Sequence, residues 1–360
     1  WFDDKLSVRK EIVVNPKTAG ITAPTAAFPF ALRLSEQTVA FEDLAEDGAD
    51  IRITGPDGKR VEHYVESVDP KAGLAVVWVR GAGLNPGGNQ TYRLYYGGDA
   101  KSVANPAAVF DGSELLALDF SDGGADRTKN GNAVQGQVQT GPGFAGQSAR
   151  LSGAPLRIAA STSLNAAAGA PFTLMTWVNP AQAGDGVLFS RGSGLSLGLA
   201  GGQAVARVGG VQVAGGPVAP GAWTHLALVG RAGGQVELYV GGRLVGRGQA
   251  ATPALAEEVL VGQGFNGQID NLRYAAADRA PGYVAAVAAS DQGRGLVTFG
   301  AEQTRSGKFE LGYFMTVITN VTIEGWVVIG LCAVMLALAV WVMITKSALV
   351  SRIEKQNEAF

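Results

Sequence analysis

Hydrophobic and polar positions alternate in short runs over about the first 300 residues of this 360-residue chain, and one long apolar segment follows them. The short runs are rich in β-branched residues and are separated by turn-forming clusters such as Gly55-Pro56-Asp57-Gly58. This pattern predicts an all-β ectodomain of two consecutive β-sandwiches, residues 1–108 and 113–302, followed by a transmembrane α-helix.

Local patterns predict several individual elements. The run 74–79 (LAVVWV) is apolar at every position, so both faces of the strand need cover and we expect it to be central in its sheet. The pair Gly241-Gly242 predicts a two-residue hairpin turn, because glycine accepts positive φ without a Cβ clash. A short helix is expected over residues 279–290 and a last strand over 295–301, whereas the Gly- and Ala-rich stretch 213–220 is expected to be a loop.

The apolar segment spans residues 325–345 and contains no charged residue. At about 1.5 Å per residue, a helix of this length extends roughly 30 Å, the thickness of the hydrocarbon core of a bilayer. Trp326 and Trp341 near its ends and Lys346 directly after it fit membrane anchoring, because indole rings and basic side chains favour the interface. We therefore predict a membrane-spanning helix; a helix buried in a protein core is the alternative.

The charges that flank this segment predict its orientation. Basic residues that directly follow a span are usually retained in the cytoplasm, so residues 346–360 are expected to begin a cytoplasmic helix. The sandwiches would then lie outside, and Trp1 in place of Met fits a chain whose signal peptide was removed, or a trimmed chain. Residues 306–324 have helical hydrophobic spacing and form either an amphipathic helix on the membrane surface or an extension of the span.

Composition narrows the classes of function. A net charge of −2 gives no general attraction to nucleic acid. Cys332 is the only cysteine, so no internal disulfide can form. The two histidines, His63 and His225, have no partner cluster in sequence, and a structural role is the simpler interpretation for each. No nucleophile–base signature, P-loop or HExxH motif occurs, so the chain is predicted not to be an enzyme.

Four motifs in the first 100 residues carry a family resemblance. They are FPFALRLSE, EDGADIRIT, VEHYVESVDPKAGLAVVWVR and YRLYYGG. Together they resemble the bacterial domain of unknown function DUF2341, which implies a small extracytoplasmic β-sandwich without an established activity. Its acidic residues form either a metal cluster or solvated turn and edge positions; they are Asp47, Asp50, Asp57, Glu62 and Glu66.

Three motifs in the second region carry another resemblance. They are FTLMTWVNP, GAWTHLALVGRAGGQVELYVGGRLVG and FNGQIDNLRYAAADRAPGYVAAVAA. In this order they resemble the laminin-G-like, concanavalin A-type jelly roll. The resemblance implies a domain that recognises glycans or proteins, often with calcium. The loops are poor in aromatic residues, so a protein target is at least as well supported as a sugar.

Calcium is the one candidate cofactor, because it needs six to eight oxygen ligands and the second region has an acidic, Gly-rich opening loop. That loop, SDGGADRTKNGNA, resembles the family's opening loop, and Asp270 stands in its G-x-I-D motif. The candidate ligands are Asp119, Asp122, Asp126, Asn130 and Asp270. The alternative is that these side chains cap turns and bond backbone amides.

The last 50 residues, from LGYFMTVITN to KQNEAF, resemble the beginning of the MotA/TolQ/ExbB proton-channel family. The resemblance implies a bacterial inner-membrane protein with periplasmic sandwiches and a cytoplasmic C-terminal side. It also implies a homo-oligomeric ring, typically a pentamer, around an ExbD- or TolR-like membrane subunit. The pore residues of that family would lie on two further spans beyond this chain.

Two functions follow from these resemblances. The first is the large-ectodomain subunit of an ExbB/TolQ-like, proton-driven transport or motor complex, whose periplasmic domains engage a protein or glycan target. The alternative is a single-span, membrane-anchored lectin or adhesin-like binding protein without ion transport.

Overall fold

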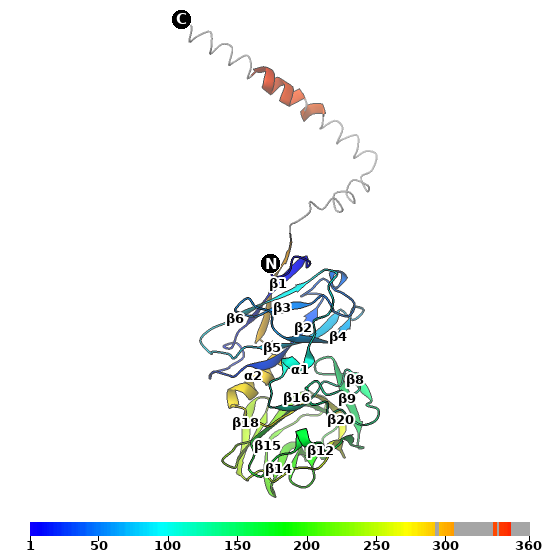
Figure 1. Ribbon diagram of the computed structural model, residues 1–360, viewed down its shortest axis with the longest axis vertical. Helices are drawn as coiled ribbons and strands as arrows, with labels where there is room; N and C mark the ends of the chain where they lie inside the picture. Colours follow the sequence, from blue (N-terminus) through cyan, green and yellow to red (C-terminus); the bar gives the residue numbers. More distant parts are fainter. Residues whose placement is uncertain (292–294, 306–333, 337, 347–360) are drawn as a thin grey trace. The chain divides into compact units, whose positions relative to one another are not determined.

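The computed structural model describes residues 1–291, 295–305, 334–336 and 338–346. The chain divides into two compact units, Trp1–Arg305 and Ser306–Phe360. The first unit is built almost entirely of β-strands, arranged as two sandwiches with short helical segments near their junction (Figure 1). This agrees with the prediction of two consecutive β-sandwiches.

The first sandwich consists of a four-stranded and a three-stranded antiparallel sheet. The four-stranded sheet has the order β21 (Val297–Thr304), β1 (Val8–Val14), β6 (Gln90–Tyr96) and β3 (Arg52–Thr54). The three-stranded sheet has the order β2 (Phe28–Ser35), β5 (Leu74–Gly81) and β4 (His63–Asp69). A short 3-10 helix, η1 (Phe41–Asp43), follows β2.

The central place predicted for the run 74–79 is confirmed. Strand β5 lies between β2 and β4, and only its first residue, Leu74, is an exposed large apolar side chain. Val77 and Val79 pack into the first sandwich, whereas Trp78 packs on the opposite face against the second sandwich. An apolar residue at every position is therefore explained by a sheet with protein on both sides.

The second sandwich is a jelly roll of two larger sheets. One sheet has the order β18 (Arg243–Gln249), β17 (Gln235–Val240), β16 (Thr224–Gly230), β11 (Phe172–Pro180), β20 (Asn266–Ala275), β9 (Gln147–Ser152) and β8 (Thr140–Pro142), with β7 (Glu114–Leu118) also paired to β20. The other has the order β10 (Leu156–Ile158), β19 (Val259–Gln263), β12 (Gly186–Arg191), β13 (Leu195–Ala200), β14 (Gln203–Val208) and β15 (Val211–Pro217). The 3-10 helix η2 (Thr162–Leu164) follows β10.

Two predictions about the second region need correction. The strand expected over 295–301 forms as β21, but it pairs with β1 and so completes the first sandwich rather than the jelly roll. The chain therefore returns to its first domain after the jelly roll, and the range 113–302 overstates the extent of the second domain. The stretch 213–220, expected to be a loop, is largely the edge strand β15, which pairs with β14.

Helices α1 (Pro106–Val109) and α2 (Pro281–Asp291) lie at the junction of the two sandwiches (Figure 1). Tyr283 and Val287 of α2 pack in one cluster with residues of the first sandwich and with Met175 of β11 and Tyr239 of β17. The predicted helix over 279–290 is thus confirmed. The predicted turn also forms: Gly241 and Gly242 both have positive φ and join β17 to β18.

In the second unit the chain is helical at 334–336 and 338–346, and Trp341 is exposed. Within the described residues, no helix has both the length and the apolar character needed to span a bilayer. Residues 325–333 and 337 of the predicted span, including Trp326, lie outside the described residues, as do 306–324 and all of 346–360 except Lys346.

Candidate functional site

Two of the five predicted calcium ligands hold the opening loop of the jelly roll in shape. Asp126 accepts hydrogen bonds from the backbone N–H groups of Ala117 (3.1 Å), Thr128 (2.9 Å) and Asn132 (2.8 Å). The side-chain amide of Asn130 donates to the backbone carbonyls of Glu114 and Leu115. An Asp that accepts several backbone donors is a common way to fix a loop without a metal.

Asp119 forms a buried ion pair. Arg127 Nε lies 2.8 Å from one carboxylate oxygen and its Nη2 lies 3.1 Å from the other. The hydroxyls of Ser121 (2.8 Å) and Tyr64 (3.1 Å) also donate to this carboxylate. Asp122 is 77% exposed and lies 3.7 Å from the same guanidinium. Asp119 is therefore surrounded by donors, and the contact from Tyr64 on β4 connects the two sandwiches.

Asp270 on β20 is fully buried and accepts backbone hydrogen bonds. Its two oxygens receive the N–H groups of Ala145 (3.0 Å) and Asn271 (2.7 Å). Burial raises its pKa well above the usual range of an aspartate, these backbone donors lower it, and the nearby charge of Asp119 raises it. These contacts are those of the alternative interpretation, in which Asp270 bonds backbone amides.

Among the residues that the structure describes, no three His, Cys, Asp or Glu side chains are grouped so that they could hold a metal ion. Asp119 and Asp270 come near one another, as the fold-family resemblance implied, but hydrogen-bond donors already meet their oxygens. Calcium binding thus remains a prediction, and the contacts favour structural roles for these residues.

The acidic residues of the first sandwich also have separate roles. Asp47 and Asp57 each accept a bond from a backbone N–H two residues further on, which is the expected role of a turn residue. Asp50 is buried and accepts from the backbone of Ala45 and Gly97. The interpretation as turn positions fits Asp47 and Asp57, whereas Asp50 is an internal acceptor.

Glu66 is different, because it connects the two sandwiches. One of its oxygens accepts a bond from the Trp78 indole N–H (2.7 Å) and the other from the backbone N–H of Gln147 in β9 (3.2 Å). Gly146 approaches this carboxylate so closely that any side chain there would collide with it. Burial raises the pKa of Glu66 well above its usual range, and the charges of Asp119 and Asp270 raise it further.

We call the contact region between the two sandwiches the seam: it consists of Tyr64, Glu66, Trp78, Phe110, Asp119, His225, Asp270 and Arg273. Arg273 is 2% exposed, and its guanidinium lies 4.7 Å from the Trp78 ring centre and 5.7 Å from that of Phe110. His225 is also buried, next to Trp177, and burial lowers its pKa to about 3. Neither the imidazole nitrogens nor the Nη atoms of Arg273 have a hydrogen-bond partner among the described residues. The sequence indicated a structural histidine with satisfied hydrogen bonds: the burial of His225 fits a structural role, but its ring nitrogens lack those bonds among the described residues.

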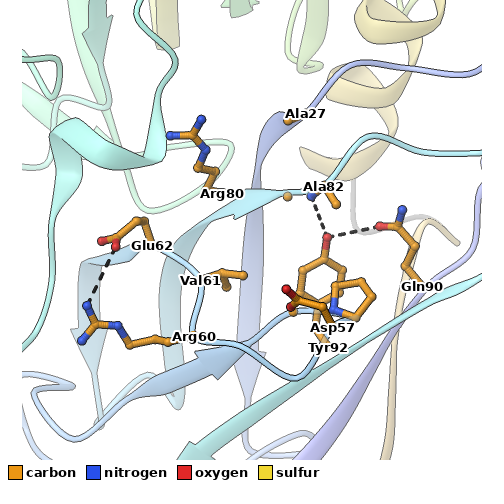
Figure 2. Close-up of a pocket in the computed structure, with 12 residues that line it drawn as sticks. Ala27, Asp57, Arg60, Val61, Glu62, Arg80, Ala82, Gln90 and Tyr92 are labelled. Atoms are coloured by element: carbon orange, nitrogen blue, oxygen red, sulfur yellow. Dashed lines mark hydrogen bonds and ion pairs between the residues drawn. The ribbon is translucent and has the colours of Figure 1, made fainter.

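The first sandwich contains a groove away from the predicted calcium ligands of the jelly roll. It has a volume of about 640 Å³ and lies between the turn that follows β3, the end of β5 and the start of β6 (Figure 2). We call it the β3–β5 groove; its walls include Pro56, Asp57, Arg60, Val61, Glu62, Arg80, Ala82, Gln90 and Tyr92.

Polar groups lie at two sides of this groove. On one side, the Tyr92 hydroxyl accepts the N–H of Ala82 (2.8 Å) and donates to Gln90 (3.2 Å), as Figure 2 shows. Burial raises the pKa of Tyr92, so its phenol is neutral and remains a donor at neutral pH. On the other side, Arg60 and Glu62 are partly exposed and lie 3.9 Å apart.

The groove therefore offers an apolar wall, around Val61, with separated donors and acceptors at its sides. Its lining contains no His, Cys, Ser or Lys. Such a lining is suited to recognition by contact and hydrogen bonding. In the sequence, Asp57 and Glu62 stand out only as acidic residues. The charged run DGKR, which follows a strand, could have indicated charged side chains at the edge of a groove.

The fold defines a class: a protein built of two consecutive β-sandwiches, the second a jelly roll. Two family models match parts of the chain. Residues 152–278 match the model described as the concanavalin A-like lectin/glucanases superfamily, and residues 47–129 match the domain of unknown function DUF2341. The chain thus contains a laminin-G-like jelly roll and a DUF2341 domain. Comparison with curated proteins finds no match.

Several solved structures resemble about half of the chain. They include the binding domain of paraclostridial mosquitocidal protein 1 (13% identity, TM-score 0.43, 49% of this chain and 52% of that one). Domain 4 of AbnA, an extracellular arabinanase from Geobacillus stearothermophilus, has 19% identity, a TM-score of 0.42 and coverage of 49% and 98%. The binding domain of botulinum neurotoxin DC has 13% identity, a TM-score of 0.40 and coverage of 50% and 52%. The chain spans about half the length of the two toxin domains.

Proposed function

We propose that this chain is a non-catalytic binding protein whose two β-sandwiches recognise a protein or glycan target and whose apolar segment 325–345 anchors it in a membrane. The observation that carries the proposal is the match of residues 152–278 to the lectin/glucanase superfamily. That family fold provides a rigid scaffold, and recognition depends on the surface it carries.

We assign target recognition to the β3–β5 groove. Its volume of about 640 Å³ is within the range of small-molecule and peptide sites. Its apolar wall at Val61 and Ala82 would desolvate one face of a ligand, while Arg60 and Gln90 would fix its orientation by hydrogen bonds. No exposed aromatic ring lines the groove, which favours a peptide segment of a protein over a sugar ring.

The proposal is tested by binding of the full chain to arrays of peptides and of bacterial polysaccharides. The double variant Asp57→Ala, Arg60→Ala removes one charge of each sign from the groove. The matched control Arg157→Ala, Glu258→Ala removes an exposed ion pair from the jelly roll. We expect the groove variant to lose at least about tenfold in affinity for any captured target and the control to lose none. Equal binding by both variants would remove the groove from the proposal.

A second candidate is the ExbB/TolQ-like motor subunit, and the observation that favours it is the uncharged segment 325–345 followed by basic residues. In this function the sandwiches would be the periplasmic part of a proton-driven, homo-oligomeric complex with an ExbD- or TolR-like partner. Protease added to intact spheroplasts should digest the sandwiches in either case. Only the motor subunit should co-purify as a ring with a small membrane partner; recovery as a single-span protein without that partner would exclude it.

A further inference from the structure

A lysine occupies an inward-facing position of the first sandwich. On β1, Val8, Lys10, Ile12 and Val14 face the core, and the other three members of this set belong to its hydrophobic cluster. Lys10 is only 7% exposed. An ammonium group on the apolar face of a strand costs stability unless something compensates for its lost hydration.

The Lys10 nitrogen is not among the described side-chain atoms that are both buried and unpaired, so water reaches it, but no described residue pairs with it. Lys10 stands directly opposite Glu302 of β21 in the sheet, the arrangement that usually forms a cross-strand ion pair. Glu302 instead accepts a hydrogen bond from the Tyr96 hydroxyl at 2.5 Å. Within the part of the chain that the structure describes, the ammonium of Lys10 has neither an ion pair nor a hydrogen bond.

Lys10 lines a second cavity of the first sandwich. This cavity has a volume of about 500 Å³ and is separate from the β3–β5 groove. We call it the Lys10 pocket; its walls include Lys10, Glu36, Val39, Phe41, Glu42 and Glu302. Val39 and Phe41 give the pocket walls apolar surface, and Glu36 and Glu42 are exposed residues of the same lining.

The charges of this pocket specify the ligand. The ammonium of Lys10 has no partner among the described residues, so it can attract one carboxylate through a charge-assisted hydrogen bond. A ligand with several negative charges would be repelled by the three glutamates, whereas a cationic group on the ligand would be attracted to Glu36 and Glu42. The geometry points to a binding site for a short zwitterionic peptide, with its carboxylate on Lys10 and its ammonium group at the acidic rim.

The test uses the full chain and three probes: glycylglycine, N-acetylglycylglycine, which lacks the ammonium group, and glycylglycine amide, which lacks the carboxylate. Binding is followed by saturation-transfer NMR and calorimetry. We expect glycylglycine to bind saturably and each blocked probe to bind at least about tenfold more weakly. No saturable binding of glycylglycine would overturn the assignment.

Variants separate a ligand site from a structural lysine. Lys10→Met keeps the apolar stem of the side chain and removes the charge, so the melting temperature should not fall, whereas glycylglycine affinity should fall at least about tenfold. Lys17→Met, at an exposed lysine in the turn after β1, is the matched control and should change neither quantity. Unchanged affinity in Lys10→Met, or a lower melting temperature, would contradict the proposal.

A double variant at the exposed rim, Glu36→Gln, Glu42→Gln, tests the charged recognition without touching the core. It should weaken glycylglycine binding but not that of N-acetylglycylglycine, an anion that two fewer glutamates repel less; an equal loss of affinity for both probes would exclude recognition of the ammonium group. The groove variant Asp57→Ala, Arg60→Ala should bind glycylglycine normally, so this inference and the proposed function can fail separately.

Discussion

The two faces of the eight-stranded sheet differ in chemistry although the same strands build both. The face toward the six-stranded sheet carries aliphatic and aromatic residues such as Leu174, Leu228 and Leu272, all without exposure to solvent. The face toward the first sandwich carries the seam, with charged side chains such as Arg273 and Asp270 equally buried. One sheet therefore stabilises the molecule by two different means.

The difference shows what each face requires. The jelly-roll interior requires apolar side chains of suitable volume. Substitution by another apolar residue of similar size should therefore cost only moderate stability. In the seam, carboxylates depend on particular donors, as Asp119 does on Arg127, whereas the Nη atoms of Arg273 have no hydrogen-bond partner among the described residues. A buried pair of this kind adds little net stability, but the loss of one partner is costly. The seam should thus define how the two sandwiches join more than how strongly each is folded.

The largest expected effect comes from the jelly-roll interior. Leu228→Ala on β16 removes buried methyl groups and leaves a cavity, so it should lower the free energy of unfolding by about 2–5 kcal/mol. Val229→Ala, one residue further on, faces the other side of the sheet and removes less volume, so it should cost less. Urea unfolding measures both; equal losses would mean that the two faces do not differ in packing as described.

Breaking the buried ion pair should have the next largest effect. Asp119→Asn leaves Arg127 with a weaker acceptor, which should cost about 1–3 kcal/mol. The control is Glu258→Gln in the pair with Arg157, where both side chains are exposed (40% and 53%) and the N···O distance is 2.5 Å. That surface pair should contribute less than about 1 kcal/mol. A control variant that costs as much as Asp119→Asn would contradict the importance of burial.

The elements that sequence predicted best are those with local causes. β5 follows from an apolar residue at every position of one short run, α2 from a short run with Pro281 near its first turn, and the hairpin turn from Gly241-Gly242. The pairing of β21 with β1 joins residues nearly 300 positions apart, and no periodicity within either strand specifies that partner. β15 was missed because its glycines resemble a loop, although β14 supplies the pairing.

The candidate site was less predictable for the same reason. Asp119 and Asp270 were chosen from a family pattern and do come near one another, but Arg127 and the backbone of Ala145 surround them with donors. The β3–β5 groove is formed by loops and strand ends from distant parts of the sequence, which no single motif describes. Lys10 has no ion pair with Glu302, its neighbour on β21, and Glu302 accepts a hydrogen bond from the distant Tyr96 instead, which no local pattern predicts.

The contribution of the seam to the free energy of unfolding should depend on pH, whereas that of the jelly-roll interior should not. Glu66 has a raised pKa when folded, so the folded protein retains a proton that the unfolded chain releases above about 4.5. This group therefore lowers stability progressively as pH rises from about 4.5 to its folded pKa. Glu66→Gln should flatten that part of the profile in urea unfolding at a series of pH values. An unchanged slope would show that Glu66 is not the titrating group.

The smallest expected effect is that of calcium on the melting temperature. Its size shows whether Asp119, Asp126 and Asp270 act as hydrogen-bond acceptors or as metal ligands. If Asp119, Asp126 and Asp270 serve as acceptors for Arg127 and backbone amides, their oxygens are already satisfied and calcium should shift the melting temperature by less than about 1 °C. Asp270→Asn should then lower the melting temperature equally with calcium and with EDTA, because it weakens hydrogen bonds that do not involve the ion. A calcium-dependent rise that Asp270→Asn abolishes would instead establish these residues as metal ligands, and the seam would then be a metal-dependent joint between the two sandwiches.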